Sequence, residues 1–186
     1  MTRLLPKDFH FEQYGLSVRL VSEDDTDFIM SLRTDEKKSR YIHKTENDVH
    51  KHLDWLKKYK MRESEGRDYY FIYFDKNNNP VGLNRIYNIY EYYGTPGSWL
   101  CPISNNMETT LSTYFIGKNI AFEILKLDLL IIDVRKQNKS VWKLHQSLGA
   151  QRIGESDIDY YYSMSKIDYM KNRDKYLDLL KIDRNI

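Results

Sequence analysis

The sequence holds little of what marks a secreted, membrane-spanning or zinc-binding protein. Its single cysteine, Cys101, excludes an internal disulfide and leaves no set of cysteines for a zinc knuckle. No apolar run approaches the roughly 18 residues that cross a bilayer. Leu4-Leu5 is too short for the apolar part of a signal peptide. These absences predict a protein with no membrane partner, in a reducing, cytoplasmic compartment.

The sequence also has almost no excess of one charge over the other. The sequence has 29 lysine and arginine residues against 27 aspartate and glutamate residues, a formal net charge of +2, and the two signs lie side by side, as in residues 35–40. A nucleic-acid-binding surface needs a concentrated basic face, so we expect no nucleic-acid partner. His50 and His52 lie two positions apart on a predicted helix and point in different directions. We therefore expect solvated surface histidines and no metal site.

Apolar patterning predicts the strands of a sheet. Alternating, aromatic or β-branched runs predict strands over residues 16–21, 68–74, 81–87, 98–103, 129–134 and within 150–164. The run over 129–134 is interpreted as an apolar, central strand that is covered on both faces. We expect a loop over 88–97, and we expect Pro102 to end the pairing of its strand or to bulge it.

Helix starts are predicted from acidic capping boxes, in which a serine or threonine precedes an aspartate by three positions. They are Ser22 with Asp25, Thr45 with Asp48, and Ser165 with Asp168. The helix from Thr45 is expected to follow the row Val49, Leu53, Leu56 and Lys60. Further helices are expected over 111–125 and 138–148, with Gly149 as a C-cap glycine. The order β-α-α-β-β-β-α-β-α-β-α predicts a mixed sheet with helices on both faces.

One stretch resembles a known family. The residues Asp133-Val-Arg-Lys-Gln-Asn138-Lys-Ser-Val-Trp-Lys-Leu-His145-Gln-Ser-Leu-Gly149-Ala150 are similar to the second half of the GNAT fold. There a strand leads to an asparagine, a short helix, an aromatic position and a glycine. The resemblance covers about residues 16–165, and a C-terminal helix over about 166–182 follows. It implies one acyl-CoA N-acyltransferase domain over 1–186, an α/β (mixed α+β) fold whose central mixed sheet is flanked by helices on both faces.

A second set of segments narrows the resemblance. Leu32-Arg-Thr-Asp35, Arg40-Tyr-Ile-His43 and Leu53-Asp-Trp-Leu56 resemble two branches of the family. One branch acetylates amino groups on nucleotide-linked sugars, and the other acetylates the N-termini of ribosomal proteins. The resemblance implies an N-acetyltransferase that uses acetyl-CoA as co-substrate, without metal, through direct attack by a primary amine. We favour a nucleotide-linked aminosugar as acceptor; a protein N-terminus, another small amine, and a noncatalytic CoA-binding module are the alternatives.

The loop before the long helix departs from the family pattern. The family places Gln/Arg-x-x-Gly-x-Gly/Ala there, and its backbone N–H groups bind the CoA pyrophosphate at a helix N-terminus. This chain has Ile103-Ser-Asn-Asn-Met-Glu-Thr-Thr110, without a glycine. Asn105 and Asn106 tolerate a left-handed backbone that could shape a phosphate site, while Glu108 would repel phosphates. The implied CoA-binding set is Ile103, Asn105, Asn106, Met107, Glu108, Thr109, Asn138 and His145. For Asn138, a simple polar residue at a helix N-terminus is the alternative.

Catalytic roles are implied in the same way. A backbone N–H at Leu100 or Cys101 is expected to polarise the thioester carbonyl. His145 stands where many relatives carry a tyrosine that protonates the leaving thiolate. With a reference pKa of about 6.5, roughly a quarter of such imidazoles are protonated at pH 7. Packing beneath the cofactor is the alternative. Cys101 as a nucleophile would need a base such as a histidine beside it.

Residues of the acceptor cleft are implied on two segments, and they are Arg40, Tyr41, Asn84 and Arg85. Arginines suit the two phosphates of a nucleotide-linked sugar; ordinary surface arginines are the alternative. The sequence leaves the general base and the oligomeric state open. The C-terminal helix either supports a homodimer or completes the core.

Overall fold

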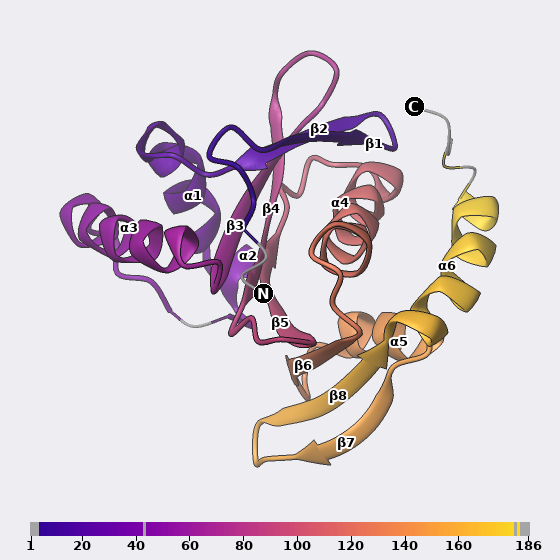
Figure 1. Ribbon diagram of the computed structural model, residues 1–186. Coiled ribbons are helices and arrows are strands. Elements are labelled where there is room, and N and C mark those ends of the chain that lie inside the picture. The colour runs from indigo at the N-terminus through magenta and orange to yellow at the C-terminus, as the bar shows by residue number, and fades with distance from the viewer. Residues whose placement is uncertain (1–3, 43, 181, 183–186) are drawn as a thin grey trace.

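The structure, a computed structural model, describes residues 4–42, 44–180 and 182. The described chain forms an eight-stranded sheet in the order β1-β2-β3-β4-β5-β6-β8-β7 (Figure 1). Its strands are β1 His10–Gln13, β2 Leu16–Leu20, β3 Asp68–Phe74, β4 Pro80–Tyr87, β5 Tyr93–Leu100, β6 Leu129–Arg135, β7 Gln151–Glu155 and β8 Asp159–Ser165. Its helices are η1 Glu23–Asp25, α1 Thr26–Arg33, α2 Glu36–Ser39, α3 Val49–Ser64, α4 Met107–Asn119 with its π-helical extension η2 Ile120–Ile124, α5 Lys139–Ser147 and α6 Lys166–Leu180.

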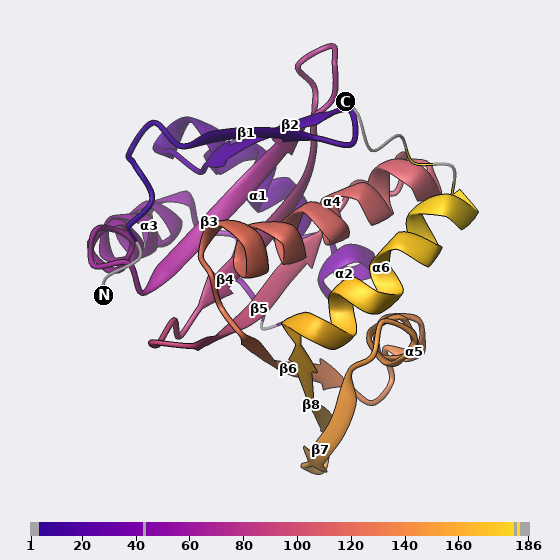
Figure 2. The same ribbon diagram turned by 45° about the vertical axis from the view of Figure 1, so that its right-hand side comes forward.

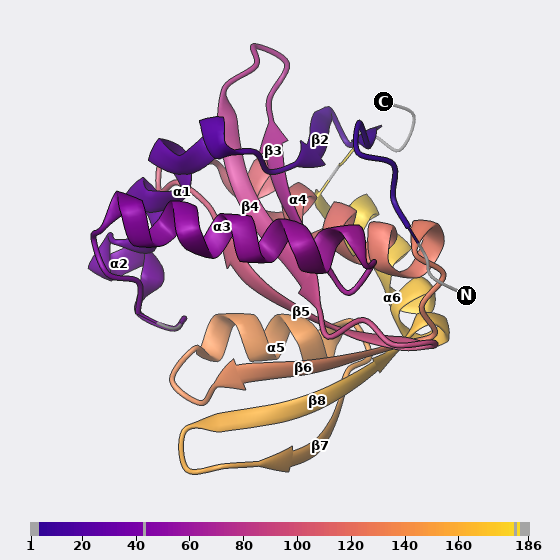
Figure 3. The ribbon, with the colours of Figure 1, turned by 60° about the vertical axis from the view of Figure 1, so that its left-hand side comes forward.

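The sheet opens between its two middle strands. All neighbouring strands are antiparallel except β5 and β6, which run parallel and pair only at Tyr93 with Leu129 and at Gly94 with Leu130. Beyond these residues β5 stays with β4 while β6 stays with β8, so the two strands diverge (Figure 3). Each strand therefore has an edge that no neighbouring strand of the described sheet covers.

Helices cover both faces of the sheet, with α1 and α3 on one face and α4 and α6 on the other (Figure 2). Successive side chains of a strand point to opposite faces, and β3 supplies both cores in this way. Tyr69 and Phe71 belong to the core beneath α4, whereas Tyr70 and Ile72 belong to the core beneath α3. No helix in the described part of the chain is long and apolar enough to span a membrane.

Most of the predicted elements are confirmed, together with the mixed sheet and the helices on both faces. The capping boxes at Asp25 and Asp168 form: Ser22 N–H donates to the Asp25 carboxylate at 2.7 Å, and Asp168 N–H donates to Ser165 Oγ at 3.0 Å. Gly149 follows α5 with a φ of +93°. Glycine adopts this left-handed conformation without the strain that a side chain would bring.

The structure differs from the sequence predictions in several segments. Strand β1 was not predicted, and β5 begins at Tyr93, inside the segment 88–97 that was expected to be a loop. The pairing of that strand stops at Leu100, two residues before Pro102, which agrees with the first of the two roles expected of Pro102; the bulge at Pro102 does not occur. The second capping box does not open its helix at Thr45. Helix α3 starts at Val49 because the Asp48 side chain is its N-cap and accepts the Lys51 N–H.

Candidate active site

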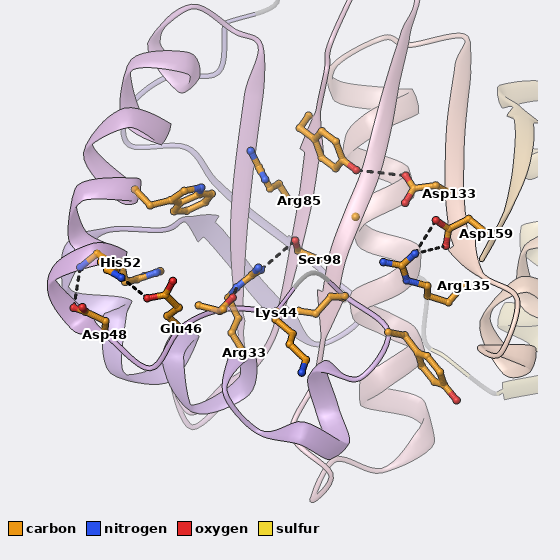
Figure 4. A pocket seen from close by; sticks show the side chains of 17 residues that line it. Arg33, Lys44, Glu46, Asp48, His52, Arg85, Ser98, Asp133, Arg135 and Asp159 are labelled. Atoms are coloured by element: carbon orange, nitrogen blue, oxygen red, sulfur yellow. Dashed lines mark hydrogen bonds and ion pairs between the residues drawn. The ribbon is translucent and has the colours of Figure 1, made fainter. Parts of the chain in front are cut away.

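A cavity of about 570 Å³ lies on the α3 face of the sheet, beside the divergence of β5 and β6. Strands β4, β5, β6 and β8 contribute to its lining, and so do α1, residues 41–42 and 44–48, and the first turns of α3 (Figure 4). Charged side chains point into it from opposite sides: Arg33, Lys44 and Glu46 from the helical side, and Asp133, Arg135 and Asp159 from β6 and β8.

Arg33 is the cavity arginine whose charge is not neutralised. Its Nε donates to Thr45 Oγ1 at 2.7 Å, and its Nη1 lies 3.4 Å from Ser98 Oγ. Among the described residues no carboxylate lies within ion-pair distance of Arg33 or of Lys44. By contrast, Arg135 pairs with Asp159 at 2.9 Å. Arg33 and Lys44 thus leave positive charge available in the cavity wall.

Arg85, predicted to face the acceptor, does line the cavity. Its guanidinium makes a two-pronged ion pair with the buried Asp68, in which Nε donates to Oδ1 at 2.7 Å. It also lies 5.2 Å from the ring centre of Trp55 and 4.9 Å from that of Tyr87. A bidentate arginine between two rings has little freedom to move. Arg85 therefore forms a rigid part of the wall.

His52 lines the cavity, although we expected it on the surface. Its side chain is 6% exposed because α3 packs on the sheet through His52, Leu56 and Tyr59, while Val49, placed on the predicted inner row, is exposed. The Nε2 atom of His52 is buried and has no hydrogen-bond partner in the described structure. Burial, and then the charge of Arg33, lower the pKa of His52. The imidazole is therefore neutral at pH 7.

Asp133 and Tyr87 meet across β5. The Tyr87 hydroxyl lies 3.5 Å from Asp133 Oδ1, a contact that spans from β4 to β6. Gly97 on the intervening strand leaves room for it, since a Cβ there would stand 2.8 Å from Tyr87 Cε1. Burial and then the charge of Asp133 raise the pKa of Tyr87 to about 12, so the hydroxyl keeps its proton. The expectation that β6 is covered on both faces is wrong at Asp133, which is exposed.

A β-bulge lies in the cavity floor. Gly97 pairs with Arg85 and Leu100 pairs with Leu83, so Ser98 and Trp99 together oppose Asn84 alone. Ser98 has a φ of +50°. A bulge leaves one residue out of the ladder and so frees backbone polar groups at this point. Leu100, one of the two residues predicted to polarise a carbonyl, is buried and pairs within the ladder. That role at Leu100 or Cys101 stays a prediction.

Cys101 lies beyond the end of β5, on the α4 face. Its Sγ is 3.4 Å from Thr113 Oγ1 of α4. Burial raises the pKa of this thiol to about 11, so the thiol is neutral at pH 7. Neither a histidine nor any other base contacts it in the described part of the chain. The arrangement disfavours a nucleophilic cysteine.

The glycine-free loop is shaped differently from our expectation. Neither Asn105 nor Asn106 has a positive φ. Instead, Asn106 is the N-cap of α4 and accepts the Thr109 N–H at 2.7 Å, while the Asn105 amide donates to the Val81 carbonyl at 2.7 Å. The prediction that these two asparagines adopt a left-handed backbone around a phosphate is therefore wrong.

A conventional helix N-terminus replaces the nest. The first N–H groups of a helix have no intrahelical partner. The cap uses that of Thr109, which leaves those of Met107 and Glu108 for an anion. With the uncovered edges of β5 and β6, these groups fit the pyrophosphate and the extended pantetheine arm of CoA. Both Met107 and Glu108 are exposed, so the Glu108 carboxylate can turn toward solvent.

His145 does not have the protonation state that we expected. It is 5% exposed, and its Nδ1 lies 2.7 Å from the Tyr114 hydroxyl. Burial, and then the charge of Lys118, hold the pKa of His145 well below its usual value. Lys118 is itself buried, which lowers its pKa to about 7. The expectation that roughly a quarter of His145 is protonated at pH 7 is therefore wrong. Contact of His145 with CoA and its role in proton transfer stay predictions.

The remaining predicted residues divide between the two faces. Tyr41, like Arg85, lines the cavity. Arg40 is exposed outside the lining and lies 4.5 Å over the Tyr41 ring. Asn84 points to the opposite face: a Cβ on Gly117 of α4 would stand 2.6 Å from its Nδ2. Asn138 is the N-cap residue of α5 without a side-chain capping bond. Its proposed contact with the cofactor stays a prediction.

Comparison with known proteins identifies the class. Residues 16–151 match the family model of the acetyltransferase (GNAT) domain, so the chain belongs to the GNAT family. It is an acyltransferase that acts as an N-acetyltransferase. In sequence, no protein with a curated description matches it.

Solved structures agree with this assignment. FdhC, described as a nucleotide-linked sugar GNAT, is 31% identical with a TM-score of 0.81, covering 93% of this chain and 99% of FdhC. The spermidine N-acetyltransferase from Vibrio cholerae with CoA and spermine is 17% identical with a TM-score of 0.72, covering 84% of this chain and 98% of that one. RimJ of Mycobacterium smegmatis with CoA-disulfide is 13% identical with a TM-score of 0.74, covering 94% of each chain. The last two share the fold.

Proposed function

We propose that the enzyme transfers the acetyl group of acetyl-CoA to a primary amine on a nucleotide-linked aminosugar. The observation that carries this proposal is the unneutralised charge of Arg33 and Lys44 in the cavity wall. Phosphate groups are the acceptor component that such charges attract. The 31% identity to FdhC over nearly the whole chain supports the same acceptor class.

A polyamine or a peptide N-terminus fits this wall less well. A polycation needs several free carboxylates, yet Glu46 pairs with Lys51 and Asp159 pairs with Arg135. Arg33 and Lys44 would repel such an acceptor. A nucleotide-linked aminosugar carries negative charge on its phosphates and positive charge on its amine. The cavity offers cations, Arg33 and Lys44, for the phosphates and a carboxylate, Asp133, for the amine.

The chain supplies the positions and the polar groups for a direct transfer. The uncharged amine attacks the thioester carbonyl of acetyl-CoA. The new N–C bond forms as the C–S bond breaks, and the proton that the nitrogen loses balances the one that the CoA thiolate takes up. The uncovered edges of β5 and β6 hold the pantetheine arm, and Met107 and Glu108 N–H groups at the start of α4 receive the pyrophosphate. A backbone N–H at Leu100 or Cys101, beside the bulge, would polarise the thioester carbonyl. Such a donor stabilises the charge that grows on the carbonyl oxygen.

The test compares two arginines that lie close in sequence. Arg33→Ala removes the free charge in the cavity, whereas Arg40→Ala removes an exposed arginine outside it. We expect Arg33→Ala to lower kcat/KM for a nucleotide-linked aminosugar by about 10- to 100-fold, mainly through the acceptor KM, because charged hydrogen bonds contribute about 1.5–3 kcal/mol. Arg40→Ala should change it less than about threefold.

The acceptor panel includes the free aminosugar without its nucleotide, spermidine, and a peptide with a free N-terminus. Preference for spermidine or for the peptide, unaffected by Arg33→Ala, would overturn the acceptor class. Binding of CoA without product from any acceptor would identify a noncatalytic module instead.

A further inference from the structure

Among the described residues, the cavity lining holds one carboxylate that neither pairs with a cation nor caps a helix. Of the acidic residues in its lining, Glu46 pairs with Lys51, Asp159 pairs with Arg135, and Asp48 caps α3. In the described part of the chain, Asp133 has no cation within ion-pair distance. Its polar contact is with the neutral hydroxyl of Tyr87.

Asp133 also stands at the place where acetyl transfer occurs in the proposed function. It lies three residues beyond Leu130, the last residue of β6 that pairs with β5. Its neighbours Ile132 and Val134 are buried in the core beneath α4, so alternation along the strand directs Asp133 into the cavity on the opposite face. Figure 4 shows its carboxylate turned toward the interior of that cavity.

The contact with Tyr87 orients this carboxylate. The Tyr87 hydroxyl approaches one oxygen, Oδ1, and the ring is held over Gly97 and beside the Arg85 guanidinium. Oδ2 and the remaining lone pairs of Oδ1 are left for another donor. An ammonium group offers up to three N–H donors and a positive charge, which is the complement that this carboxylate lacks.

We propose that Asp133, oriented by Tyr87, binds the ammonium group of the acceptor and thereby selects amines over hydroxyl compounds. The inference rests on the proposed function for the nature of the rest of the acceptor. With Arg33 and Lys44 at one side and Asp133 at the other, the cavity aligns a bipolar acceptor, its phosphates toward the helices and its nitrogen toward the open strand edges.

The experiment measures binding by calorimetry, without acetyl-CoA, of two matched ligands. One is a nucleotide-linked aminosugar, and the other has a hydroxyl in place of the amine. Wild-type protein should bind the amine at least about tenfold more tightly, as a charge-assisted hydrogen bond implies. In Asp133→Asn, an isosteric change at an exposed residue, the affinity for the amine should fall to that of the hydroxyl compound. Affinity for the hydroxyl compound should change less than about twofold.

The control is Asp54→Asn, which removes an exposed carboxylate on α3 that lies outside the cavity lining. We expect this variant to keep the preference for the amine. A preference that survives in Asp133→Asn, or an equal loss of affinity for both ligands, would overturn the assignment of Asp133.

Failure of the proposed function gives a different result. In that case neither nucleotide-linked ligand binds the wild-type protein. The same comparison is then made with spermidine and with the matching diol. Loss of the amine preference in Asp133→Asn supports the role of Asp133 with that acceptor, and its persistence overturns it.

Discussion

The two faces of the sheet each bury a histidine, and the two histidines differ in their partners. On the α4 face, His145 Nδ1 shares a hydrogen bond with the Tyr114 hydroxyl at 2.7 Å. On the α3 face, His52 Nε2 has no partner among the described residues and lies in the cavity wall. A buried polar atom without a hydrogen bond destabilises a fold. The difference between these two residues indicates that His145 serves packing in the core beneath α4, whereas His52 presents a polar atom to the ligand-binding cavity.

The largest effect on stability is expected from His145→Ala. The substitution removes a buried ring and leaves the Tyr114 hydroxyl, which is also buried, without its partner. The free energy of unfolding should fall by about 3 kcal/mol, from the combined cavity and hydrogen-bond losses. Urea unfolding measures this loss, and the exposed His50 on α3 provides the control, since His50→Ala should cost less than about 0.5 kcal/mol. A loss below about 1 kcal/mol for His145→Ala would contradict the comparison.

The second prediction concerns function on the α3 face. His52→Gln keeps a polar side chain but changes the position of its donor and acceptor atoms. We expect a stability loss of at most about 1 kcal/mol, because no hydrogen bond to His52 Nε2 is broken. The acceptor KM should rise by about 5- to 10-fold, while the KM for acetyl-CoA stays unchanged. Steady-state kinetics with each substrate varied in turn measures both. An unchanged acceptor KM would remove His52 from the binding wall.

The stability of the protein should depend on pH through both histidines, since the pKa of each is lowered in the folded state. The folded protein binds fewer protons than the unfolded chain once the pH falls below the unfolded pKa of about 6.5. Stability is therefore complete above that pH and falls as the pH is lowered, by up to about 1.4 kcal/mol per pH unit for each histidine.

The variant His145→Gln isolates one of these contributions. Between pH 7 and pH 5.5, its loss of stability should be about 1 kcal/mol smaller than that of the wild type, because one buried titrating group is gone. Chemical denaturation at several pH values gives the two slopes. Equal slopes would mean that His145 is protonated as readily in the folded protein as in the unfolded chain.

The segments whose structure depends on local pattern could be predicted from the sequence. The alternation of residues 16–21, the hairpin of 68–74 and 81–87, and the spacing from Asn138 to Gly149 were sufficient for the mixed sheet and the GNAT assignment. The inner row of α3 was not decided locally. Leu56 belongs both to the predicted row with Val49 and to the row with Tyr59. The row with Tyr59 is buried because the Tyr59 hydroxyl accepts the Tyr70 N–H of β3 at 2.8 Å.

The cavity residues were harder to predict, for two different reasons. Asp133 carried a signal, since a lone carboxylate in an apolar strand has to face water or a ligand. Arg33 carried none. Its free charge results from contacts with Thr45 and Ser98, which come from segments that only the fold brings together.

The smallest effect is expected at Cys101. Its substitution tests whether this side chain, which contacts α4, serves packing or takes part in the reaction. Only a thiolate is a strong nucleophile, and burial keeps this thiol neutral at pH 7 by raising its pKa to about 11. Its Sγ contacts Thr113 rather than a base. Cys101→Ala should therefore keep kcat within about twofold and lower stability by less than about 1 kcal/mol. A hundredfold loss of kcat with CoA binding intact would instead place the chemistry on the α4 face. The contrast between the packed side chains of His145 and Cys101 and the cavity-lining His52 would then fail.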